Sequence, residues 1–141
     1  MNMIKEIAFG NNLITFKSSG ATPILYKQTF KEDLIVLQKE LAKKRDELQK
    51  IKNKDTNKDT DEYYNSAFDV KEVTETMIQQ LAFIMWVEGN FKDEELFKQL
   101  TQVKYIEFLM MFDINDLLIK GADILAIYNN NSKTLSKPKN E

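Results

Sequence analysis

The sequence has neither cysteine nor histidine among its 141 residues. Without them the chain has no disulfide, no thiolate or histidine metal site, no cysteine nucleophile and no histidine base, which removes the usual catalytic triads and dyads. A glycine-rich phosphate-binding loop is missing as well. We therefore expect a non-enzymatic protein that uses no cofactor or metal, and the lack of cysteine suits a reducing compartment.

Long apolar segments are also missing. The longest uninterrupted apolar run, residues 81–87, is far shorter than the roughly 18 to 20 residues that span a bilayer. The first nine residues include Lys5 and Glu6 and lack the apolar segment of a secretory signal. We expect a soluble protein that stays in the compartment where it is made and has no membrane partner.

Charge is nearly balanced overall but unevenly distributed. Twenty cationic and twenty-two anionic side chains give a net charge of −2. Residues 39–58 hold eight cationic and four anionic side chains, whereas residues 61–116 hold four and twelve. The basic stretch lacks interleaved aromatics, so a solvated helix face explains it better than a nucleic-acid site. The acidic stretch favours a basic partner and repels nucleic acid.

The N-terminal part predicts a β-hairpin followed by a helix. Apolar residues alternate on both sides of the turn sequence 10–12, which indicates a hairpin over residues 4–17. Thr22 and Pro23 then suit an N-cap and a first helical position, so a helix should begin near residue 23.

Two longer helices are predicted from apolar residues at spacings of three and four. The first runs from Leu34 to about Ile51, and the second ends near Gly89, where glycine suits a C-terminal cap. Residues 53–62 between them are polar, contain a tandem Asn-Lys-Asp-Thr repeat and are expected to form a mobile linker. The two helices should pack as an antiparallel hairpin.

The linker region also partly matches a calcium-binding loop over residues 55–66, because oxygen-bearing side chains occupy alternate positions. The match fails where Thr60 stands in place of the turn glycine and where Ser66 stands in place of the bidentate glutamate. The tandem repeat explains the spacing, and weak calcium binding is left as an open alternative.

Three further helices are predicted between residues 91 and 128, which are dense in large apolar side chains. Acidic residues 93–95 suit a helix N-terminus, and Asp113 is a candidate N-cap for the last helix. Residues 129–141 should form a flexible, disordered tail. The expected fold is mostly α (α+β), with a short N-terminal β-hairpin and a helical bundle of about five helices over 23–128, all in one domain spanning 1–128.

Methionine and aromatic side chains are the candidates for a functional surface. Residues 108–112 are five consecutive apolar residues that would circle a helix, so a single buried face cannot hide all of them. Such side chains suit adaptable grooves that receive a helix. Burial in the core or in a homo-oligomer is an equally good explanation for any one of them. The candidate partner-binding residues are Met85, Trp86, Phe97, Phe108, Met111 and Phe112.

The stretch LITFKSSGATP at 13–23, with LYKQTF at 25–30 and Asp33, resembles the opening of tail assembly chaperones from long-tailed phages (siphoviruses) of Gram-positive bacteria. Similar order and spacing continue in LAFIM at 81–85 and EELF at 94–97. Two features depart from the family pattern: Lys and Glu at 31–32 where a glycine is expected, and a long charged segment that ends at residue 62.

This resemblance implies an assembly factor in the host cytoplasm that is not part of the mature virion. It would bind the tape measure protein, keep it soluble and help to recruit the major tail (tube) protein, in many family members through a longer frameshifted product. A homo-oligomer is an open alternative. Two other interpretations remain: a small non-enzymatic phage or bacterial regulator that binds a protein or DNA through the 39–58 helix, and a structural oligomerisation module.

Overall fold

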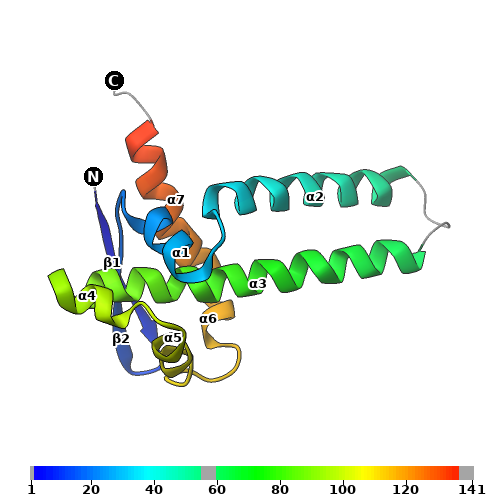
Figure 1. Ribbon diagram of the computed structural model, residues 1–141. Helices are drawn as coiled ribbons and strands as arrows, with labels where there is room; N and C mark the ends of the chain where they lie inside the picture. Colours follow the sequence, from blue (N-terminus) through cyan, green and yellow to red (C-terminus); the bar gives the residue numbers. More distant parts are fainter. Residues whose placement is uncertain (1, 55–59, 137–141) are drawn as a thin grey trace.

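The computed structural model describes the backbone of residues 2–54 and 60–136, and the side chains of residues 2–52 and 63–130. Over this part of the chain, two strands are followed by seven helices (Figure 1). The predicted mostly helical fold with an N-terminal β-hairpin is therefore confirmed, with seven helices in the described part where about five were expected. None of the described helices combines the length and apolar character that crossing a membrane requires.

The hairpin consists of β1 (Met3–Phe9) and β2 (Asn12–Ser18), which pair antiparallel with Ile7 opposite Ile14. Gly10 lies in the turn with a φ of 62°, a left-handed conformation that glycine adopts without steric penalty. Ile7 and Phe16 point into the core, where Phe16 is fully buried. The alternation that predicted the strands thus also identifies the inward face of the hairpin.

Helix α1 (Thr22–Phe30) follows β2 after a short turn and ends at Lys31, which adopts a left-handed conformation. The N-cap is Ala21, with Pro23 in the first turn, so the prediction of Thr22 as N-cap is wrong. Thr22 is the first residue of the helix, and its hydroxyl donates a tertiary hydrogen bond to Glu88 of α3.

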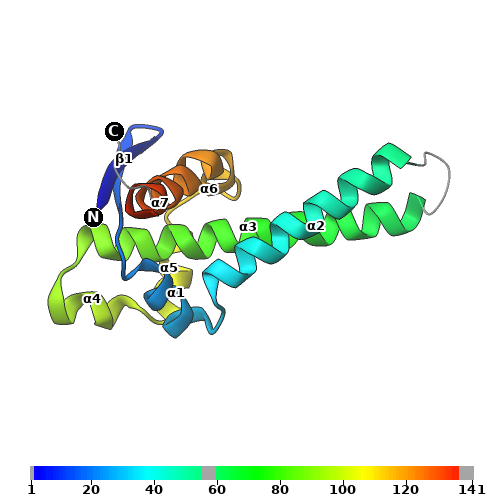
Figure 2. The same cartoon turned by 90° about the horizontal axis from the view of Figure 1, so that it is seen from above.

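Helices α2 (Leu34–Lys54) and α3 (Thr60–Asn90) run antiparallel and lie side by side (Figures 1 and 2). The predicted linker was too wide, because residues 53–54 belong to α2 and 60–62 to α3. Residues 55–59 of that linker, and with them the first part of the tentative calcium loop, lie outside the described residues.

The C-terminal half of α3 is the centre of the core. Every residue from 81 to 87 except Trp86 is buried, because β2, α1, α5, α6 and α7 pack around this part of the helix. Gly89 is inside α3 and does not cap it. A Cβ there would lie 3.0 Å from the Thr15 carbonyl oxygen and 3.2 Å from the Lys17 nitrogen, so glycine allows the helix to approach β2 closely.

Four helices complete the chain: α4 (Asp93–Gln99), α5 (Gln102–Leu109), α6 (Asp116–Ile119) and α7 (Gly121–Ser136). The predicted single last helix is divided at Lys120, and Asn115, not Asp113, occupies the N-cap of α6. Residues 129–136 continue α7 where a disordered tail was expected, since no glycine or proline interrupts the chain between Gly121 and Pro138. Residues 137–141 lie outside the described part.

Candidate partner-binding surface

Helix α5 carries large apolar side chains on two different sides. Its inner side supplies Phe108, which is 1% exposed, and Tyr105, which packs against the core. Its outer side presents Val103, Ile106 and Met110, which are 64%, 55% and 78% exposed. Spacings of three and four place these three side chains on one face over about two helical turns, with Met110 at the C-cap of α5. The outer side of α5 is therefore an apolar stripe that this chain does not cover.

Met111 in the turn after α5 extends this stripe and is 52% exposed. Together, Val103, Ile106, Met110 and Met111 form what we call the α5 surface. Single exposed apolar side chains are common in proteins, but a row of them along one helix marks a surface that gains free energy when it is covered. Full burial of one such side chain contributes about 1.5–3 kcal/mol before the costs of association.

The segment of the chain that carries the α5 surface is acidic. Residues 93–116 contain six acidic and two basic side chains. Both basic residues are engaged in exposed pairs, Lys98 with Glu95 at 3.2 Å and Lys104 with Glu107 at 3.5 Å. Exposed pairs of this kind contribute little stability. A partner that places lysine or arginine beside an apolar stripe would therefore match this region in both character and charge.

Trp86 and Phe112 belong to an aromatic cluster at the edge of the core. The Phe112 ring meets those of Phe9 and Phe108 edge to face, with centroids 4.9 Å and 5.1 Å apart. Trp86 lies against Phe108 at 5.1 Å and Phe91 at 5.3 Å. Both side chains are only half-buried, but most of their ring surface packs within the chain.

The six residues predicted from the sequence as partner contacts are thus separated by the fold. Met85 and Phe108 lie in the core and present almost no accessible surface, so the structure assigns them to packing and corrects their place in the predicted set. Phe97 and Met111 are accessible, at 61% and 52%.

Several exposed apolar residues were absent from the predicted set. Val103 and Ile106 were missed because methionine and aromatic residues were favoured over aliphatic ones, whereas Met110 lies in the run 108–112 but was not selected from it. The pattern that could have found them is a second apolar stripe in α5, offset from the one that contains Tyr105 and Phe108.

A buried carboxylate joins the turn between β2 and α1 to α3. Glu88 is 7% exposed, and its two oxygens accept hydrogen bonds from the hydroxyls of Ser19 at 2.6 Å and Thr22 at 2.5 Å. Each hydroxyl in turn accepts a backbone N–H, from Ala21 to Ser19 at 3.1 Å and from Ser19 to Thr22 at 2.9 Å. Each hydroxyl oxygen therefore accepts one hydrogen bond from an amide, while its proton is donated to the carboxylate.

Burial raises the pKa of the Glu88 carboxyl, while the two hydroxyl hydrogen bonds and the charge of Lys17 act in the opposite direction. In the described part of the chain, no lysine or arginine forms an ion pair with this carboxylate. The segment 13–33 that carries the chaperone resemblance forms β2, the turn and α1, and Glu88 holds that segment on α3.

No group of three or more acidic side chains in the described residues is placed to hold a metal ion. Comparisons with models of protein families, with curated proteins and with solved structures gave no match.

Proposed function

We propose that this protein is a phage tail assembly chaperone, which binds the tape measure protein in the host cytoplasm, keeps it soluble and helps to recruit tail-tube subunits. The observation that carries the proposal is the α5 surface, an accessible apolar stripe in an acidic segment of a folded helical domain. The resemblance of residues 13–33 to the chaperone family supports the same interpretation.

The α5 surface suits the tape measure protein because of the shape expected for that protein. A long helical protein that has not yet been enclosed by the tail tube exposes apolar stripes along its length, and one helix covers such a stripe by laying a matching stripe against it. The four side chains of the α5 surface give a contact of limited area, and association costs offset much of its burial energy. Modest affinity suits a chaperone that must leave when the tube subunits arrive.

The test is co-expression with the tape measure protein encoded in the same gene cluster, followed by measurement of its soluble fraction. Wild-type protein should raise that fraction, and Ile106→Asp should remove most of the gain because a charge replaces a side chain at the centre of the α5 surface. Ile24→Asp is the matched control, since Ile24 is also on a helix and is 58% exposed against 55% for Ile106. Both variants should unfold at the same temperature as the wild type within about 2 °C.

Met111→Asp gives an independent test of the same surface and should also reduce the soluble fraction. Phe112→Asp is a poor probe, because Phe112 packs on Phe9 and Phe108 and its loss would destabilise the fold. The proposal fails if the tape measure protein is no more soluble with the wild type than without it. It also fails if DNA is the ligand bound at moderate salt, which would favour the regulator.

A further inference from the structure

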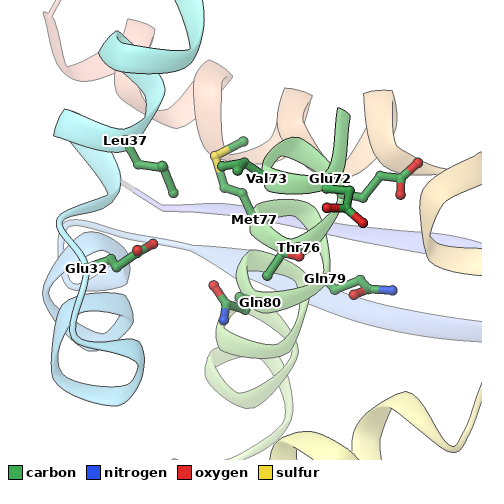
Figure 3. A pocket seen from close by; sticks show the side chains of 9 residues that line it. Glu32, Leu37, Glu72, Val73, Thr76, Met77, Gln79 and Gln80 are labelled. Atoms are coloured by element: carbon green, nitrogen blue, oxygen red, sulfur yellow. The ribbon is translucent and has the colours of Figure 1, made fainter. Parts of the chain in front are cut away.

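A groove of about 440 Å³ lies between the turn that joins α1 to α2 and the middle of α3 (Figure 3). Glu32 in this turn and Leu37 at the start of α2 form one side, and in Figure 3 these two side chains stand across the groove from Met77 and Gln80 of α3. None of the residues that line this groove belongs to the α5 surface, so the two are separate.

The floor of the groove is apolar. It is formed by Leu37, Val73 and Met77, of which Val73 is 38% exposed and Met77 is buried. Val73 and Met77 are four residues apart on α3 and therefore share a face of that helix. Thr76 and Gln79 add polar side chains beside this floor. A single large aliphatic side chain from outside would find apolar contacts on both walls.

The charged side chains that line the groove are all acidic: Glu32 on the turn side, and Glu72 and Glu75 on α3. Glu75 already pairs with Lys71 at 2.7 Å. In the described part of the chain no cation forms an ion pair with Glu32 or Glu72, which are both exposed. Carboxylates on both sides of an apolar floor produce a local negative potential that a cationic partner would neutralise.

We propose that this groove binds an amphipathic helix of a partner protein, with one apolar side chain on the Leu37–Val73–Met77 floor and lysine or arginine toward Glu32 and Glu72. A helix is the form that suits a groove between two helical walls, because residues three and four positions before and after the anchor fall on its two edges. Cations at those positions would reach the carboxylates on opposite sides. This inference does not depend on the proposed chaperone function, which rests on the α5 surface.

The test uses a labelled amphipathic peptide of leucine and lysine, roughly 18 residues or five turns long, and fluorescence anisotropy with the full chain. A peptide of the same pattern with glutamate in place of lysine should not bind. The triple variant Glu32→Gln, Glu72→Gln, Glu75→Gln should weaken binding about tenfold at low salt. The matched control Glu6→Gln, Asp46→Asn, Glu47→Gln removes the same net charge at exposed positions outside both the groove and the α5 surface, and it should change affinity less than about twofold.

Methionine methyl resonances locate the bound peptide, because Met77 lines the groove whereas Met110 lies on the α5 surface. The leucine–lysine peptide should shift the Met77 resonance, and a shift of Met110 beside it would report separate binding to the α5 surface. Equal weakening by the two triple variants would overturn the proposal, since bulk charge alone would then explain binding. A shift at Met110 without one at Met77 would overturn the proposal as well. If the wild type self-associates and the triple variant at Glu32, Glu72 and Glu75 does not, a second copy of this chain occupies the groove, and the proposal is also overturned.

Discussion

Replacing Gly89 with alanine should destabilise this fold, although the same change stabilises an ordinary exposed helix by about 1 kcal/mol. Gly89 lies in the last turn of α3, where a Cβ would sit 3.0 Å from the Thr15 carbonyl oxygen, 3.2 Å from the Lys17 nitrogen and 3.3 Å from the Phe16 carbonyl carbon. All three are backbone atoms of β2, so a side-chain rotation cannot relieve the contact. The helix and the hairpin would have to separate by a few tenths of an ångström.

The expected size follows from two opposing effects. Overpacking at a tight contact costs about 1–3 kcal/mol, and the better helix propensity of alanine offsets about 1 kcal/mol. We therefore expect Gly89→Ala to lower the free energy of unfolding by about 1 kcal/mol. Separation of the helix from β2 would also strain the hydrogen bond from the Asn90 side chain to the Thr15 carbonyl, which is 3.0 Å long.

Gly20→Ala is the matched control, because a Cβ at Gly20 would meet nothing within 4 Å and its φ is not in the left-handed region. That variant should gain about 0.4–1 kcal/mol by restricting the unfolded chain. The measurement is urea denaturation of the three proteins side by side. If Gly89→Ala is as stable as Gly20→Ala, the close approach of α3 to β2 does not limit the size of residue 89 and the reasoning is refuted.

Three further predictions concern stability. Because burial raises the pKa of Glu88 in the folded protein above 4.5, its stabilising contribution is complete below that pH and is lost as the pH rises through the folded-state value. The stability of Glu88→Gln relative to the wild type should therefore increase with pH above about 4.5, and a difference that stays constant in denaturation curves from acid to neutral pH would contradict this. Phe108→Ala should cost about 3–5 kcal/mol, since its ring packs against Phe83 and Trp86. Met111→Ala, at an exposed position, should change stability by less than about 0.5 kcal/mol in the same assay.

The sequence by itself determined the elements whose cause is local. Alternation on both sides of Gly10 predicted the hairpin because successive side chains of a strand point to opposite faces. Spacings of three and four predicted the long helices α2 and α3, and the acidic residues 93–95 correctly marked the start of α4. Each of these patterns depends only on neighbours within about one turn of the chain.

Only the tertiary structure decided which of the apolar side chains are accessible. Helix α5 is apolar on two sides, so periodicity could not tell whether Phe108 or Ile106 faces the core, and contacts with Trp86 and Phe83 bury Phe108. The roles of Glu88 and Gly89 were hidden for the same reason. Their partners in the β2–α1 segment lie about seventy residues earlier in the sequence. A carboxylate between two hydroxyls, or a glycine against a strand, is specified by distances in space that no local pattern encodes.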